Sequence, residues 1–327
     1  MVFKLIDVQC SSIDEEKASI GALIIREGGT VVFPTETVYG IGADAESDEA
    51  CRKIYRIKGR QQDNPLIVHV SDIKQAGNYA YTSQVEKFYE LSGLWPGPLT
   101  VVMPRNDRVS QVASAGLDTV GIRIPDCAFT RDFIRLSRKG VAAPSANMSG
   151  RPSATRAEHI MDELSGVDLI YRAEKSRIGI ESTVILPQGT KCTILRPGAY
   201  TREDLLNIFD IVEYAGPADK VRSPGMKYRH YSPGKQLFRA EKEQLLAYLD
   251  IHHDVLPIVT AETAADIKGD RLILGSINDP YAISSSLYDS FRTLDSSKYE
   301  RGIIECMPEK GFFTSIMNRI RKASVEL

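Results

Sequence analysis

The sequence predicts an α/β protein in which a twisted, largely open sheet flanked by helices is followed by a smaller α/β domain. Short apolar runs typical of buried strands alternate with helix-like segments over residues 1–213. The alternation stops at 214–236, where three prolines occur and the triplet SPG appears twice. It resumes over 237–327, and 327 residues suffice for two domains. We therefore expect domains at 1–213 and 237–327, joined by a linker at 214–236.

Local patterns justify the elements of the first domain. Asp14–Arg26 carries apolar residues at helical spacing and is closed by two glycines. Thr201 and Asp204 resemble a capping box that starts a helix reaching Phe209. Further helices are predicted from Ser47 or Asp48 through Arg56 and over Ser83–Ser92. The predicted strands are Val31–Phe33, Leu66–Val70, Leu99–Met103, Val120–Ile124, Gly140–Ala143, Leu169–Tyr171, Ser182–Leu186 and Thr193–Leu195.

The second domain shows the same alternation on a smaller scale. Asp279 and Pro280 open a helix whose apolar residues share one side, as a cap followed by proline predicts. Helices are also expected at Glu241–Leu249 and Phe313–Lys322, and strands at Val255–Val259, Leu272–Leu274 and Ile303–Cys306. This order predicts a mainly parallel sheet. No G-x-G-x-x-G motif follows a strand here, so the sequence does not support a dinucleotide site.

Composition predicts a globular protein of the cytoplasm. The apolar fraction is 43% and the formal net charge is −2, which does not suggest a general polyanion binder. The five cysteines are scattered without a C-x-x-C pair, so reduced, mostly buried thiols are expected rather than a zinc or redox site. We see no run long enough to span a membrane and no charged-then-apolar leader at the N-terminus.

Three segments carry residues suited to chemistry. In VVFPTETVYGIGADA (31–45) a strand closed by proline leads into two threonines, which share a face if the chain stays extended. In KIYRIKGRQQDNPLIVHV (53–70) cations precede an Asn-Pro turn and a strand interrupted by a histidine. In VAAPSANMSGRPSAT (141–155) a strand breaks into hydroxyl and amide side chains. Such groups, with exposed backbone N–H groups in tight turns, are the usual means of holding phosphate.

Together these segments resemble the YrdC-like family of threonylcarbamoyl-AMP synthases. The resemblance covers PTETVYGIGADA, Lys58-x-Arg60 with Asn64-Pro65-Leu66, His69, LWPGPLTVVMP (94–104), GIRIPD (121–126), APSANMSGRPS (143–153), Glu181–Thr183 and ILRPGAY (194–200). The remaining tail resembles the extra domain of the two-domain form. The implied fold is a YrdC-like twisted open sheet plus a small Rossmann-like domain. Gln61 stands where the family commonly has proline, which should alter loop stiffness rather than chemistry.

The resemblance implies synthesis of L-threonylcarbamoyl-AMP from L-threonine, bicarbonate or CO₂, and ATP, with release of pyrophosphate. This is the first step toward threonylcarbamoyladenosine in tRNA. The implied threonine-binding residues are Thr35, Thr37, His69, Arg123, Ala143, Ser182 and Thr183. The implied ATP-binding residues are Lys58, Arg60, Asn64, Thr119, Ser145, Asn147, Ser153, Arg196 and Tyr231. Mg²⁺ is expected with ATP, although no residue is assigned as its ligand or as a catalytic acid or base. The expected downstream partner is a tRNA threonylcarbamoyl transferase.

Each candidate has a structural alternative. Lys58 and Arg60 could belong to a solvated helix end, the expected state of Arg52. Arg123 could form an ion pair with Asp126 or Glu36 instead of binding the threonine carboxylate, and His69 could be a core residue. The hydroxyls of Ser182 and Thr183 could cap the start of a strand.

Two other functions compete with the synthase. One is a YrdC-like protein that binds double-stranded RNA or tRNA through a basic face without synthase activity. The pI near 6.3 and the lack of aromatic residues interleaved with the basic cluster oppose it. The other is a carbamoyl-transfer domain of a hydrogenase-maturation protein, for which this chain has neither the length nor the cysteine spacing.

The linker composition also predicts a lid. Lys227–Tyr231 places two cations, a histidine and two tyrosines in succession, which is richer chemistry than a tether needs. We expect residues 214–236 to fold back over the first domain's site, with Tyr231 touching ligand. A stiffened spacer with a basic surface is the alternative.

Overall fold

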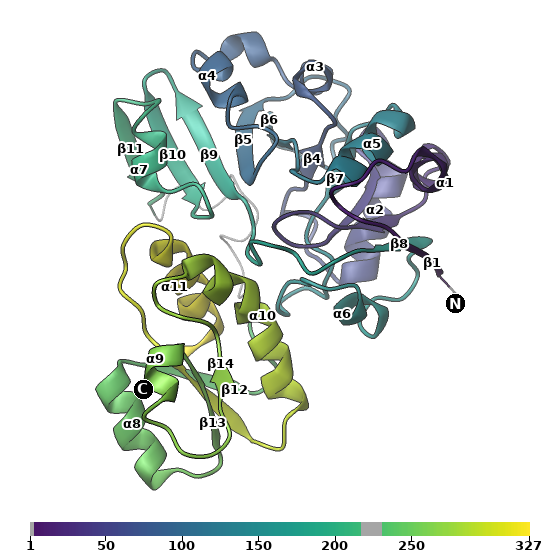
Figure 1. The fold of residues 1–327 in the computed structure, drawn as a ribbon. Coiled ribbons are helices and arrows are strands. Elements are labelled where there is room, and N and C mark those ends of the chain that lie inside the picture. The colour runs from purple at the N-terminus through teal and green to yellow at the C-terminus, as the bar shows by residue number, and fades with distance from the viewer. Residues whose placement is uncertain (1–2, 217–230) are drawn as a thin grey trace.

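The computed structural model describes residues 3–216 and 231–327 and contains two sheets with helices packed against them (Figure 1). The strands of a large, twisted sheet lie between residues 4 and 214, and those of a small sheet between 236 and 326. This confirms the predicted fold class. Residues 217–230 lie outside the described residues, and so does most of Lys227–Tyr231. The linker, its lid role and the domain limits therefore stay predictions.

Within residues 3–216, the first domain contains eleven strands. They are β1 (Lys4–Asp7), β2 (Val31–Phe33), β3 (Gly40–Asp44), β4 (Ile67–His69), β5 (Leu99–Pro104), β6 (Thr119–Arg123), β7 (Val141–Ala143), β8 (Leu169–Arg172), β9 (Thr183–Gln188), β10 (Lys191–Arg196) and β11 (Ile211–Tyr214). Its helices are α1 (Glu15–Arg26), α2 (Asp48–Lys58), α3 (Ile73–Ala76), α4 (Phe88–Ser92), α5 (Ala128–Ser137), α6 (Glu158–Met161) and α7 (Arg202–Leu205), with a 3₁₀ turn, η1, at Thr82–Gln84.

Strand order in the large sheet is β1-β8-β2-β3-β7-β4-β6-β5-β9-β10-β11, with parallel and antiparallel pairs mixed. The central strands β4, β6 and β7 alternate their side chains between two faces. Val68, Ile122 and Ala142 are buried in the main apolar core on one face. Because the period is two, the flanking residues His69 and Arg123 point to the other face. On one face, β4 and β6 therefore present polar side chains, whereas the opposite face packs in the main apolar core.

Strand β3 was not predicted, because its glycines have low β-propensity. It pairs antiparallel with β2, placing Gly40 opposite Phe33 and Gly42 opposite Val31. A Cβ at Gly40 would lie 2.9 Å from the Phe33 ring, and one at Gly42 would collide with Val141 and Phe33. These glycines therefore allow close packing inside the sheet.

Several helix predictions need correction. Ser83–Ser92 is not one helix but the turn η1 followed by α4, because the 3₁₀ turn ends at Val85 in extended backbone. The helix after Thr201 is only α7, although the capping box with Asp204 is present. Helix α2 begins after the Ser47 cap, as expected, and continues past Arg56 to Lys58. In the first domain, β1, α3, α5, α6 and β11 were also not predicted from the sequence.

The cysteine prediction was wrong for one pair. Cys10 and Cys127 form a disulfide that ties the N-terminal segment to the start of α5. The two are 117 positions apart, and sequence spacing alone cannot show such pairing. Cys51 and Cys192 are buried free thiols, as predicted, and Cys306 is a half-buried free thiol.

The second domain has an all-parallel five-stranded sheet, ordered β14-β13-β15-β12-β16. Its strands are β12 (Gln236–Ala240), β13 (Val255–Val259), β14 (Leu272–Ile273), β15 (Arg301–Glu305) and β16 (Val325–Glu326), and its helices are α8 (Lys242–Ile251), α9 (Ala261–Ala264), α10 (Pro280–Ser296) and α11 (Phe313–Ala323). Helices α10 and α11 lie on the side of the small sheet nearest the first domain (Figure 1). Across the described ranges, no helix has the length and apolar character needed to cross a membrane.

Candidate active site

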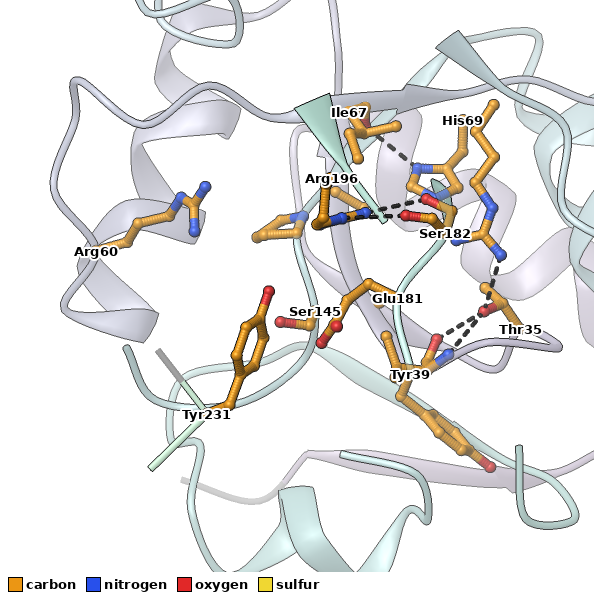
Figure 2. Close-up of a pocket in the computed structure, with 15 residues that line it drawn as sticks. Thr35, Tyr39, Arg60, Ile67, His69, Ser145, Glu181, Ser182, Arg196 and Tyr231 are labelled. Atoms are coloured by element: carbon orange, nitrogen blue, oxygen red, sulfur yellow. Dashed lines mark hydrogen bonds between the residues drawn. The ribbon is translucent and has the colours of Figure 1, made fainter. Parts of the chain in front are cut away.

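A cavity lies beside the face of β4 and β6 that carries His69 and Arg123, and Figure 2 shows residues that line it. The lining residues are Thr35, Val38, Tyr39, Gly40, Arg60, Ile67, His69, Arg123, Ala143, Pro144, Ser145, Glu181, Ser182, Arg196 and Tyr231. Most come from strand ends and from the loops that follow β2 and β7.

The cavity collects many of the residues predicted from the sequence. From the threonine set it contains Thr35, His69, Arg123, Ala143 and Ser182, and from the ATP set Arg60, Ser145, Arg196 and Tyr231. The other predicted residues do not line it: Thr37, Lys58, Asn64, Thr119, Asn147, Ser153 and Thr183. The binding roles of both groups stay predictions.

His69 and Arg123 lie side by side because β4 and β6 are parallel and in register at these positions. The His69 ring is buried, and its Nδ1 lies 3.2 Å from the carbonyl oxygen of Ile67. Burial, and then the charge of Arg123, lower the pKa of His69 to about 3. The imidazole is therefore neutral at physiological pH and can offer a hydrogen bond without adding charge.

Arg123 is buried and bonded to the loop that follows β2. Its Nη2 donates to Glu36 Oε1 and Thr37 Oγ1, both at 2.8 Å, and to Thr35 Oγ1 at 3.4 Å. The ion pair with Glu36, one of the two structural alternatives, is thus present, but the guanidinium also lines the cavity. Within the described part of the chain its buried Nε has no hydrogen-bond partner. A carboxylate in the cavity could satisfy such a donor.

Of the predicted threonine-binding hydroxyl groups, some line the cavity and others hold neighbouring residues in place. Thr35 Oγ1 donates to the carbonyl of Val38 at 2.7 Å and lies 2.9 Å from Thr37 Oγ1, so Thr37 supports Thr35 from behind. Ser182 Oγ lies at the cavity wall, 2.8 Å from Thr100 Oγ1. Thr183 Oγ1 instead donates to the backbone of Tyr200 at 2.8 Å. Thr183 thus holds the loop at Tyr200, and its role in binding stays a prediction.

Arg60 and Arg196 are two further cations that line the cavity, and Arg196 lies next to Ser182 (Figure 2). Arg60 donates to the carbonyls of Asn64 and Pro65, and Arg196 to the carbonyl and Oγ of Ser182. Among the described residues neither forms an ion pair within 4.0 Å. Burial is the main cause that lowers the pKa of both, to about 10 for Arg60. Two desolvated guanidinium groups without carboxylate partners favour an anionic ligand.

Lys58 is placed differently from expectation. Its side chain is buried, and its Nζ donates to the carbonyl of Ser145 at 2.6 Å and to the carbonyl of Asn147. Burial and the nearby Arg60 lower the pKa of Lys58 well below its usual value. Ser145 Oγ donates to Asn147 Oδ1 at 2.6 Å. Lys58 thus shapes the Ser145–Asn147 turn from beneath, and only Ser145 faces the cavity.

The remaining predicted residues lie near the cavity. The carbonyl of Asn64 accepts from Arg60 Nε, and Thr119 lines a smaller, partly apolar hollow that shares Ile67 with the main cavity. Ser153 Oγ donates to Glu181 Oε1 at 2.5 Å. From the sequence, Glu181 is recognisable only as part of a motif. No local pattern marks its role, since most of its partners lie more than a hundred positions away.

Because His69 is buried and neutral, we expect the free energy of unfolding to fall in acid. Below its ordinary pKa of 6.5 the unfolded chain binds a proton that the folded chain excludes, so stability should fall as pH drops from 6.5 toward 3. At pH 5 the loss from this group is about 2 kcal/mol. Urea unfolding of the parent and of His69→Gln at pH 7.5 and 5 checks this. The exposed His253→Gln is the control, and an unchanged pH dependence in His69→Gln would contradict the prediction.

The chain is similar to known proteins along almost its whole length. A family model described as "Telomere recombination" (Sua5/YciO/YrdC) matches residues 23–198, and one described as "Threonylcarbamoyl-AMP synthase, C-terminal domain" matches 200–325. Curated threonylcarbamoyl-AMP synthases from Pyrococcus abyssi and Bacillus subtilis are each 36% identical; the alignments cover 95% of this chain and 95% of the first, and 96% of this chain and 94% of the second. A crystal structure of P. abyssi Sua5 complexed with L-threonine superposes with a TM-score of 0.89 at 33% identity, covering all of both chains. The chain therefore belongs to the threonylcarbamoyl-AMP synthase family, in the form with a YrdC-like domain and a C-terminal domain.

Proposed function

We propose that this protein makes L-threonylcarbamoyl-AMP from L-threonine, bicarbonate or CO₂, and ATP. The threonine amine and bicarbonate form an N-carboxylate with loss of water. A carboxylate oxygen then attacks the α-phosphorus of ATP, and the bond to pyrophosphate breaks. The product is an acyl adenylate that serves tRNA modification. In class terms the enzyme is a nucleotidyltransferase.

The observation that carries this proposal is that a single cavity brings together three arginines with different surroundings. Arg123 with its unsatisfied Nε, beside neutral His69, suits an amino-acid carboxylate. Arg60 and Arg196 are desolvated, form no ion pairs in the described chain, and suit a chain of phosphates. The superposed P. abyssi protein was crystallised as a complex with L-threonine, which supports the first assignment.

Such a reaction needs positioning and charge neutralisation rather than an enzyme nucleophile. Arg123 would orient threonine by its carboxylate, leaving the amine toward the middle of the cavity. Arg60 and Arg196 would neutralise the phosphates and the departing pyrophosphate, and arginine can grip phosphate oxygens in pairs. No residue is assigned as a general base.

We treat Mg²⁺ as part of the ATP substrate. In residues 3–216 and 231–327, no three His, Cys, Asp or Glu side chains converge as metal ligands. The one carboxylate among the lining residues, Glu181, is already bonded to Arg319. An ion bound through phosphate oxygens and water fits this donor set better than a resident ion.

Pyrophosphate release tests the function directly. Purified protein with MgATP should release pyrophosphate only when both threonine and bicarbonate are present, and the product should carry the mass of threonylcarbamoyl-AMP. Release without threonine would contradict the proposal. Retention of the adenylate until a tRNA transferase is added would identify the downstream partner.

The RNA-binding alternative loses support from the placement of the basic cluster. Arg52 is exposed and paired with Asp48 at 3.5 Å, and Lys53 donates to the carbonyl of Gly28. Lys58 is buried, and Arg60 is desolvated beside the cavity. The cations therefore do not form one continuous basic face. Salt-dependent binding of tRNA with no ATP turnover would revive this alternative.

Tyr231 belongs to the predicted lid and lies within the described residues, so it provides a test of that prediction. It lines the cavity and has a φ of 68°, a left-handed conformation that non-glycine residues rarely adopt. Tyr231→Ala should weaken ATP affinity by about tenfold, the scale of one lost ligand-contacting aromatic side chain. Calorimetry with a non-hydrolysable ATP analogue measures this, with the exposed Tyr89→Ala as the control. Unchanged affinity in Tyr231→Ala would show that the segment is only a spacer.

A further inference from the structure

The carboxylate of Glu181 is held from several directions at once. It lines the cavity just before Ser182, yet its side chain is almost fully buried. Oε1 accepts from Ser153 Oγ at 2.5 Å and from Tyr288 Oη at 3.2 Å. Oε2 accepts from Arg319 Nε at 2.9 Å and from Tyr288 Oη at 3.1 Å. Three donors thus fix both oxygens.

Two of these donors come from the second domain. Tyr288 lies on α10 and Arg319 on α11, and both side chains are fully buried. Arg319 Nη1 also donates to the carbonyl of Pro197 at 2.8 Å, immediately after Arg196. Its guanidinium carbon lies 5.4 Å from the centre of the Tyr231 ring, which stacks on Tyr288 at 5.7 Å. The second domain therefore reaches the wall of the cavity.

The position of Glu181 matters because of its neighbours. Arg196 and Arg60 line the same cavity, and in the described residues neither forms an ion pair within 4.0 Å, although the charge of Glu181 acts on Arg196 from a distance. A carboxylate that could turn toward them would form an ion pair and compete with an incoming phosphate. Burial opposes ionisation of Glu181, but Arg319 and Arg196 outweigh it and hold its pKa at about 2. Glu181 is therefore charged at neutral pH.

We propose that Arg319 is a positioning residue that keeps Glu181 from neutralising the arginines needed for ATP. By binding Oε2 from the second domain, Arg319 holds the carboxylate against the cavity wall, and Tyr288 assists it. Arg196 and Arg60 then stay available for phosphate. The second domain thereby tunes the charge that the proposed site offers to the nucleotide. This inference rests on the proposed ATP-dependent function.

A separate set of contacts between the domains lies away from the lining of the cavity. Asp289 on α10 bonds to Thr155, Arg156 and Lys175, and none of these residues lines it. Asp289→Asn therefore weakens docking of α10 without touching Glu181. This variant is therefore the matched control: it separates the effect of Arg319 on Glu181 from an effect on docking of the two domains.

The test measures binding of a non-hydrolysable ATP analogue by calorimetry on full-length Arg319→Met, Glu181→Gln, the double variant and Asp289→Asn. Arg319→Met should bind about tenfold more weakly or worse, the scale of a competing charged pair. Glu181→Gln should bind as well as the parent, because glutamine cannot neutralise an arginine. The double variant should recover to within about threefold of Glu181→Gln. Asp289→Asn should stay within about twofold of the parent. The KM for threonine should change less than the KM for ATP in all of them.

The pattern of rescue decides the outcome. If the double variant binds as poorly as Arg319→Met, Arg319 is only structural and the inference is wrong. Equal losses in Arg319→Met and Asp289→Asn would likewise reduce its role to docking. Should Arg319→Met fail to fold, Tyr288→Phe with and without Glu181→Gln repeats the comparison with the same expected rescue. A parent that binds the analogue but needs no threonine for turnover would overturn the proposed function and leave the positioning test intact.

Discussion

2-Aminobutyrate should be used at least about a thousandfold less efficiently than threonine, measured as kcat/KM for pyrophosphate release. The two differ only in the side-chain hydroxyl. A site that hydrogen-bonds a substrate hydroxyl rejects the analogue lacking it by about 10⁴–10⁵-fold in favourable cases, because the site's own polar groups are then left unpaired. Here the candidates are Thr35, His69 and Ser182, which all line the cavity.

Serine provides the graded comparison. It keeps the hydroxyl and lacks one methyl group, a difference worth about 10–200-fold in an apolar pocket. The expected order is therefore threonine, then serine, then 2-aminobutyrate. Similar turnover of all three would mean that Thr35, His69 and Ser182 do not form the side-chain pocket. If serine reacted nearly as fast as threonine while 2-aminobutyrate was still rejected, the predicted contact to the hydroxyl would be confirmed. The predicted contact to the methyl group would then be wrong.

The fold was largely predictable because its strands are short apolar runs that end at proline or polar residues. Val31–Phe33 has the predicted limits, and predicted strands over Leu66–Val70 and Gly140–Ala143 enclose β4 and β7. In the structure, strand alternation places His69 and Arg123 on the face opposite the main apolar core. Strand β3 was not predicted, because its glycines are needed for close packing against Phe33 and Val141, and no local sequence pattern indicates such packing.

Parts of the site could not be predicted because they depend on distant pairing. Glu181 takes its orientation from Tyr288 and Arg319, 107 and 138 positions along the chain. Lys58 could be read as a phosphate ligand from its type and spacing, yet its Nζ supports the Ser145–Asn147 turn. Charge patterns thus indicate where a site lies more reliably than which atoms face the ligand.

Arg60→Ala and Lys58→Ala should each lower activity by at least about tenfold, but for different reasons. Arg60 faces the cavity with no ion-pair partner in the described residues, so its removal takes away a charged contact worth about 1.5–3 kcal/mol. Arg60→Ala removes a desolvated charge without a carboxylate partner, which offsets the loss of its hydrogen bonds to the carbonyls of Asn64 and Pro65, so the free energy of unfolding should change by less than about 1 kcal/mol. Its loss should appear as weaker ATP affinity and a smaller ATP-induced rise in Tm.

Lys58→Ala should instead lower both activity and stability. The part-buried carbonyl of Ser145 and the buried carbonyl of Asn147 would lose their donor, at a cost of up to about 1–3 kcal/mol each. Arg52→Ala is the matched control from the same helix: its side chain is 49% exposed and pairs only with Asp48, so activity should stay within a few-fold of the parent. The measurements are kcat/KM for ATP and urea unfolding with and without ATP. If Arg52→Ala were as damaging as Arg60→Ala, the helix would act as a basic face for nucleic acid. If Arg60→Ala lost stability while its ATP affinity held, the guanidinium groups of Arg60 and Arg196 would belong to the fold, and the phosphates would have to bind elsewhere.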